Sequence, residues 1–106
     1  MIPVTSPLTT DLYELNMVQA YLDKGETKEA VFEFFVRRLP ERRGFMLAAG
    51  LEDALQYLET LSYSDEELAW LESSGRFRKN LIDFLKGFRF TGDVHAIPEG
   101  SACFPN

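Results

Sequence analysis

Apolar positions near the start of the chain recur at helical spacing, and they do so on two sides of the expected helix. One stripe contains Leu12, Leu15, Val18 and Leu22, and the other contains Tyr13, Met17, Ala20 and Tyr21. Asp11 followed by Glu14 has the spacing of a capping box, and Gly25 is a typical helix stop, so we predict a helix ending near Lys24. A helix apolar on two sides is usually covered on two sides. We therefore expect the second stripe to meet another subunit or further sequence.

Three stretches have the character of strands. Residues 30–37 are rich in Val and Phe and are apolar on both faces except at Glu33, which predicts a strand buried inside a sheet. Pro40 ends this strand, and residues 42–44 are expected to turn. Residues 92–97 alternate as a second strand does, residues 98–100 turn, and a third strand begins at residues 101–104. Because no closing element follows that last strand, we expect the domain to continue beyond Asn106.

Further helices are expected between these strands. A long amphipathic helix has apolar residues on one face (Leu47, Leu51, Ala54, Leu55, Leu58 and Leu61) and polar residues opposite (Glu52, Asp53, Gln56 and Glu59). Ser64 and Glu67 form a capping box that opens a short helix, and residues 81–88 mark another helix after Gly75. The pattern predicts an α+β fold in which helices pack on an open antiparallel sheet.

Composition excludes several classes of protein. The 106 residues are 45% hydrophobic and 13% aromatic, which indicates one folded domain rather than a disordered tail. The net charge of −6 argues against nucleic acid or an anionic membrane as partner, and no run approaches the ~20 apolar residues that span a bilayer. With the single Cys103 and no signal-peptide pattern at the start, we expect a cytoplasmic protein.

The chain contains no complete catalytic set, no phosphate loop and no metal-ligand spacing. Asp11 and Tyr13 have two interpretations: a helix cap with a core aromatic, or an aromatic ring that stacks on a planar ligand with a hydrogen-bond acceptor nearby. His95 is interpreted as structural or exposed, and Cys103 as a small buried apolar residue.

Four arginines fall within seven positions of this acidic chain: Arg37, Arg38, Arg42 and Arg43. One interpretation is a solvated strand end paired with Glu33 and Glu41. The other is a phosphate or diphosphate clamp, since guanidinium groups bind phosphate oxygens bidentately.

Five segments, in order and in register, together resemble the amino-terminal region of nicotinate phosphoribosyltransferases. They are residues 8–21, 30–40, 43–51, 90–94 and 97–100. The resemblance implies that residues 1–106 are the amino-terminal α+β portion of a two-domain enzyme whose other domain is an α/β barrel. Such enzymes, which act in NAD synthesis, join nicotinate to phosphoribosyl pyrophosphate, forming nicotinate mononucleotide and pyrophosphate. ATP hydrolysis drives the reaction, and Mg²⁺ neutralises the phosphates.

The resemblance also implies roles for three residues. Tyr13 would stack on nicotinate in the active site of the neighbouring subunit of a homodimer, Asp11 would lie beside it, and Arg38 would reach the sugar phosphate. No catalytic residue or metal ligand is expected within the chain, so the chain alone should be inactive. Two alternatives stay open: a small α+β interaction module without catalysis, and a phosphoribosyltransferase that acts on nicotinamide or quinolinate.

Overall fold

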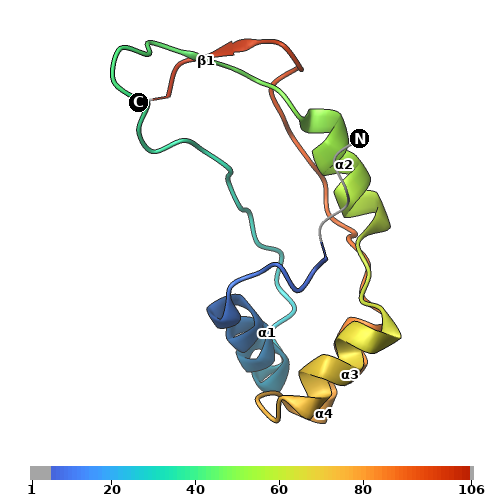
Figure 1. Ribbon diagram of the computed structural model, residues 1–106. Helices are drawn as coiled ribbons and strands as arrows, with labels where there is room; N and C mark the ends of the chain where they lie inside the picture. Colours follow the sequence, from blue (N-terminus) through green and yellow to red (C-terminus); the bar gives the residue numbers. More distant parts are fainter. Residues whose placement is uncertain (1–5, 106) are drawn as a thin grey trace.

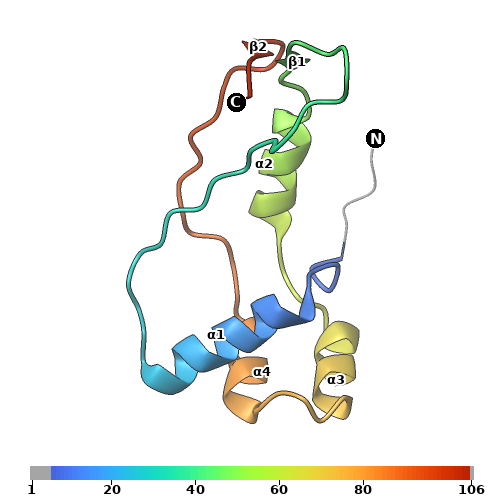
Figure 2. The ribbon, with the colours of Figure 1, turned by 90° about the vertical axis from the view of Figure 1, so that its left-hand side faces the viewer.

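Helices and strands occupy different parts of this molecule. The computed structural model describes residues 6–105, so residues 1–5 and 106 of the expected domain 1–106 lie outside the described part. The elements are helix α1 (Leu12–Lys24), strand β1 (Met46–Leu47), helices α2 (Leu51–Thr60), α3 (Asp65–Ser73) and α4 (Lys79–Lys86), and strand β2 (Ala102–Cys103). α1, α3 and α4 gather at one end of a molecule that measures 48 × 31 × 26 Å, the strands meet at the other, and α2 lies between them (Figure 1; Figure 2).

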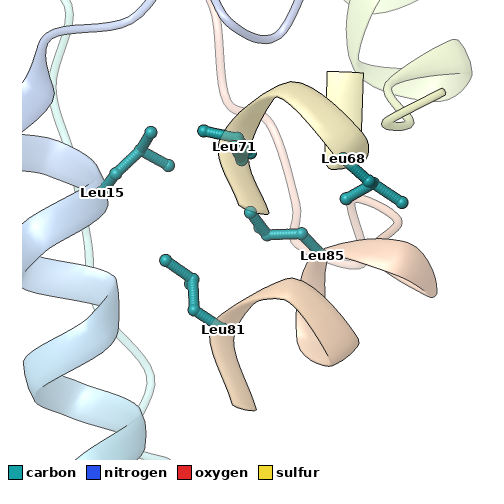
Figure 3. Close-up of a cluster of buried hydrophobic side chains, with 5 residues drawn as sticks. All are labelled: Leu15, Leu68, Leu71, Leu81 and Leu85. Atoms are coloured by element: carbon teal, nitrogen blue, oxygen red, sulfur yellow. The ribbon is translucent and has the colours of Figure 1, made fainter. Parts of the chain in front are cut away.

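A cluster of buried leucines holds the three helices at the lower end together. It consists of Leu15 from α1, Leu68 and Leu71 from α3, and Leu81 and Leu85 from α4 (Figure 3). The leucines of α3 and α4 are three or four positions apart, so each pair projects from one face of its helix. α4 is the central element because it contacts both α1 and α3. Leu15, Val18 and Leu22 of the first apolar stripe of α1 therefore face the core, as their spacing predicts, whereas Leu12 at the start of the helix is exposed.

The ends of these helices follow the local signals in the sequence. α1 stops at Gly25, whose φ of 67° is left-handed and whose amide donates to the carbonyl of Leu22 at 3.2 Å. At the start of α3, the Ser64 hydroxyl accepts from the amide of Glu67 at 3.2 Å, and the Ser64 amide donates to the Glu67 carboxylate at 2.8 Å. Both predicted ends are confirmed, including the capping box of α3.

The two strands form a short antiparallel pair that joins the middle of the chain to its last residues. Met46 lies opposite Cys103, and Leu47 lies opposite Ala102. The predicted last strand and the turn before it are confirmed, and the partner of that strand precedes it in the chain by more than 50 residues. Cys103 is half-buried beside Met46 rather than fully enclosed.

Two predicted strands are wrong. Residues 30–37 and residues 92–97 contain no strand, and most of their side chains are exposed. A strand requires backbone hydrogen bonds from a neighbour, and among residues 6–105 neither segment has a strand beside it. The strand propensity of these residues correctly indicated an extended backbone, but it carries no information about whether a second strand lies alongside.

The start of the second helix and its packing also differ from prediction. Leu47 lies in β1, and α2 begins only at Leu51, because Gly50 adopts a left-handed φ of 99° that breaks the helical path. α2 has no fully buried residue. The α+β class is confirmed, but α4 packs against α1 and α3, α2 contacts no other helix among the described residues, and the strands pair with each other. The expected packing of helices on the sheet is therefore wrong for the described residues.

Candidate functional site

The outer side of α1 carries the second apolar stripe, and it is uncovered. Tyr13 is 60% exposed, Met17 41% and Tyr21 47%, whereas Leu15 on the opposite side is buried. We call Tyr13, Met17 and Tyr21 the aromatic face of α1. Among residues 6–105, the Tyr13 ring lies outside the buried leucine cluster. An exposed stripe of this kind marks a surface that meets another molecule or another part of the protein.

Asp11 lies at the N-cap position of α1, directly before the turn that holds Tyr13. Its amide donates to the carboxylate of Glu14 at 3.2 Å, and the Thr10 hydroxyl donates to the same carboxylate. The helix-cap interpretation of Asp11 is therefore confirmed. Because Asp11 is exposed and two residues from Tyr13, its position is also compatible with a ligand on the aromatic face.

Arg38 lies in the connection between α1 and β1, outside the helix that carries Tyr13. This connection, residues 26–45, leads from the helical end to the strand end of the molecule (Figure 1; Figure 2). All four arginines of the cluster are exposed, and none forms an ion pair with Glu33 or Glu41 among the described residues. The structure thus does not bring Arg38 and Tyr13 together within one chain, and the predicted pairing with the two glutamates is wrong.

The same connection carries the most exposed apolar side chains among residues 6–105. Val31 is 86% exposed, Phe32 87% and Phe34 101%. These residues belong to the segment that the sequence predicts as a buried strand. Within residues 6–105, however, no other part of the chain covers their apolar side chains.

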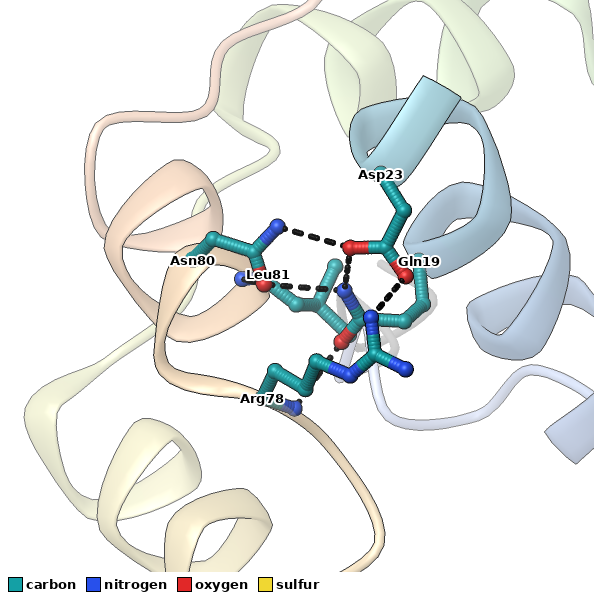
Figure 4. A network of polar contacts seen from close by, with 5 residues as sticks. All are labelled: Gln19, Asp23, Arg78, Asn80 and Leu81. Carbon is teal, nitrogen blue, oxygen red and sulfur yellow. Dashed lines mark hydrogen bonds and ion pairs between the residues drawn. The ribbon is translucent and has the colours of Figure 1, made fainter. Parts of the chain in front are cut away.

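A polar cluster that the sequence reading missed joins α1 to the start of α4. We call Gln19, Asp23, Arg78 and Asn80 the α1–α4 clamp (Figure 4). The Arg78 guanidinium donates to Asp23 Oδ2 at 2.6 Å and the Arg78 amide donates to Gln19 Oε1 at 2.9 Å. Asn80 Nδ2 donates to Asp23 Oδ1 at 3.1 Å, and Gln19 Nε2 donates to Asn80 Oδ1 at 2.8 Å. The one sequence feature that could have indicated this cluster is the spacing of Gln19 and Asp23, which are four residues apart and so lie on one face of a helix.

Hydrogen bonds to two carboxylates stabilise their charged forms. The pKa of Asp23 is lowered, chiefly because the Asn80 amide donates to it, with the charge of Arg78 acting in the same direction. The pKa of Glu67 is lowered, chiefly because the Ser6 hydroxyl donates to it and next because the Ser64 amide does. Both groups are therefore anionic around neutral pH, and both tie helical ends to neighbouring segments.

Glu99, which follows the start of α2 by 48 residues in the chain, closes the amino end of that helix. Its carboxylate accepts from the Gly50 amide at 2.8 Å and from the Leu51 amide at 2.9 Å. A negative charge at this end of a helix is favourable. The shallow hollow beside it is lined by Gly50, Leu51, Glu52, Asp53, Leu55 and Glu99. Three of these six residues are carboxylates, and one already occupies the helix end, so the hollow is unsuited to a phosphate.

Within residues 6–105, acidic residues, His95 and Cys103 do not gather into a group that could hold a metal ion. None of the helices in this part of the chain is long and apolar enough to cross a membrane.

Comparison with known proteins identifies the family. Residues 8–106 match the family described as the nicotinate phosphoribosyltransferase (NAPRTase) N-terminal domain. Nicotinate phosphoribosyltransferase pncB2 of Mycobacterium tuberculosis is 46% identical over 93% of this chain and 21% of its own length. The nicotinate phosphoribosyltransferase of Bacillus subtilis is 40% identical over 93% of the chain and 20% of its own length, and that of Mus musculus is 35% identical over 96% and 20%.

The chain therefore spans about a fifth of the length of the curated relatives it matches. The family match covers nearly all of the described residues and includes every helix and strand. Because of this family match and the 35–46% identity to the relatives, this chain belongs to the nicotinate phosphoribosyltransferase N-terminal domain family.

Proposed function

We propose that the protein to which this chain belongs is a nicotinate phosphoribosyltransferase of NAD synthesis. It would join nicotinate to the ribosyl carbon of phosphoribosyl pyrophosphate and release pyrophosphate, forming nicotinate mononucleotide. The family match over residues 8–106 carries this proposal, and relatives from two bacteria and a mammal bear the name of that activity. An α/β barrel as the second domain and a cytoplasmic location belong to the same proposal.

Within that enzyme, we assign Tyr13 to the nicotinate ring in the active site of a neighbouring subunit. The supporting observation is its exposure of 60% on a helix whose opposite side is buried. A flat heteroaromatic ring that stacks on an aromatic side chain gains contact energy beyond simple burial. Met17 and Tyr21 would extend the same face along the contact between two subunits of a homodimer.

Asp11 and Arg38 are assigned supporting roles. The exposed carboxylate of Asp11 stands one position before α1, where it can accept a hydrogen bond beside a ligand of Tyr13. The exposed guanidinium of Arg38 is suited to the phosphate of the sugar, because it offers a planar fork of donors. Arg38 and Tyr13 belong to different segments of the chain, and in this proposal they meet one substrate because Tyr13 comes from the neighbouring subunit.

ATP and Mg²⁺ are assigned to the whole enzyme rather than to these residues. The described part of the chain offers no cluster of acidic ligands for a metal ion. The 106-residue chain by itself should form no nicotinate mononucleotide, because it spans only about a fifth of the length of the relatives that bear the name of this activity. Product formation by the purified chain in a steady-state assay would contradict this assignment.

The test of the Tyr13 assignment uses the full-length enzyme and three variants. Tyr13→Ala should raise the KM for nicotinate by roughly two- to twelvefold, because a stacked ring contributes ~0.5–1.5 kcal/mol beyond burial. The KM for ATP should not change. Tyr13→Phe keeps the ring and should behave almost as the wild type, and Tyr21→Ala removes the same side chain two turns further along the same face.

Three outcomes would count against the proposal. Equal effects of Tyr13→Ala on both substrates would remove the stacking role. A change in the KM for nicotinate with Tyr21→Ala as large as that with Tyr13→Ala would show that the whole face matters rather than one ring. A full-length protein without transferase activity on nicotinate would favour an interaction module or a sibling enzyme for another pyridine.

A further inference from the structure

Both sides of helix α1 carry large apolar side chains, so burial of apolar surface by itself sets the rotation of the helix only loosely. At ~100° per residue, the stripe with Leu15 and the stripe with Tyr13 lie on nearly opposite sides of the helix. Both stripes contain large apolar side chains, and the hydrophobic effect is not directional. A roll of α1 about its own axis would bury part of the aromatic face in exchange for leucines. The packing of leucines alone therefore does not set where Tyr13 points.

The α1–α4 clamp fixes the rotation of α1 about its own axis. Gln19 and Asp23 project from one flank of α1, between its two apolar stripes, and both bond to the first residues of α4 (Figure 4). Arg78 contributes both its amide and its guanidinium, at 2.9 Å to Gln19 and 2.6 Å to Asp23. These bonds depend on the rotation of α1, so a roll of the helix breaks all of them together. In the ion pair the side chain of Asp23 is 28% exposed, whereas that of Arg78 is 73% exposed.

The effect of a small roll at Tyr13 is large. Asp23 follows Tyr13 by ten residues, which is ~15 Å along a rigid helix. A ring ~6 Å from the helix axis moves by ~2 Å for a roll of ~20°. A misplacement of about 1 Å at a reacting centre already reduces rates strongly.

We propose that the α1–α4 clamp is a positioning device for the substrate site: Gln19, Asp23, Arg78 and Asn80 fix the rotation of α1 so that the Tyr13 ring faces the pyridine. This inference rests on the role proposed above for Tyr13. The four residues touch no substrate, and they act only through the orientation of the helix. Loss of the clamp should therefore weaken the binding of the planar pyridine carboxylate and leave the KM for ATP unchanged.

The experiment measures the KM values for nicotinate and ATP in full-length variants. Each variant must first show a melting temperature close to that of the wild type, so that unfolding does not cause the effect. Asp23→Asn and Arg78→Ala should each raise the KM for nicotinate about threefold, within the roughly two- to twelvefold range expected for loss of the Tyr13 contact through which the clamp acts. Arg78→Lys retains the charge and should restore much of the affinity. Asp83→Asn is the matched control, because Asp83 pairs only with Lys79 on α4, at 3.4 Å, and does not reach α1.

A double-mutant cycle separates positioning from a general structural role. In the Tyr13→Ala background, Asp23→Asn should have no further effect on the KM for nicotinate, because the ring that the clamp positions is absent. Additive effects of the two substitutions, or equal effects of Asp23→Asn on nicotinate and ATP, would overturn the inference while leaving the stacking role intact. If Tyr13→Ala alone leaves the KM for nicotinate unchanged, the stacking role fails first and the clamp proposal fails with it.

Discussion

Replacement of Leu81 by alanine tests whether the leucine cluster holds the helices together. Leu81 has no exposed surface, and in Figure 3 its side chain lies on α4 between Leu15 of α1 and Leu85. Because α4 is the only helix in contact with both α1 and α3, a cavity at this point weakens both contacts. Leucine and alanine have similar helix propensities, so the substitution reports on packing rather than on helix formation.

The expected loss follows from the size of the cluster. Leu→Ala in a well-packed core costs ~2–5 kcal/mol, depending on how far the surroundings collapse into the cavity. Only five residues of this cluster are buried, and half-buried neighbours such as Val18, Leu22 and Ile82 can move inward. We therefore expect a value in the lower half of that range, about 2–3 kcal/mol. Such a loss is a large share of the stability of a small domain.

Urea denaturation followed by helical circular dichroism measures this loss. With an m-value of ~1.5 kcal/mol per molar urea, the midpoint of Leu81→Ala should fall by roughly 1.5–2 M. Leu12→Ala is the matched control, because Leu12 is 46% exposed and its loss should cost below ~1 kcal/mol. Equal shifts for the two variants would refute the view that the cluster, rather than general apolar content, stabilises the helical end.

Three further predictions concern the polar contacts. Ser64→Ala should destabilise the chain by about 1 kcal/mol through loss of the α3 cap, whereas Ser62→Ala should be nearly neutral in the same urea titration. Glu99→Ala should accelerate hydrogen exchange at the Gly50 amide, which loses its acceptor, and unchanged exchange would show that the cap is not formed in solution. The folded-state pKa of Glu67 lies below its ordinary value of 4.5, so its contribution is present above that pH and is lost as the pH falls through the folded pKa. Wild-type stability should therefore fall on acidification below pH 4.5 more than that of Glu67→Gln, and parallel pH curves would contradict this.

The sequence by itself determined the helical half of the fold. Residues within one turn of one another carry the signals for α1, α3 and α4: the capping box at Ser64, the left-handed stop at Gly25 and the spacing of the leucines. Hydrogen bonds in a helix join residues four apart, so local sequence is sufficient to specify them. The sequence also separated the two faces of α1 correctly and identified the family through its ordered motifs.

Only the tertiary structure decided which extended segments are strands and where Tyr13 faces. Residues 30–37 have the composition of a buried strand, yet the strand that forms is Met46–Leu47, because it meets Ala102–Cys103. In the same way, the contacts of Gln19 with Arg78 join residues 59 apart in the chain. Strand pairing and the rotation of a helix both depend on partners that are remote in sequence, and periodicity carries no information about such partners.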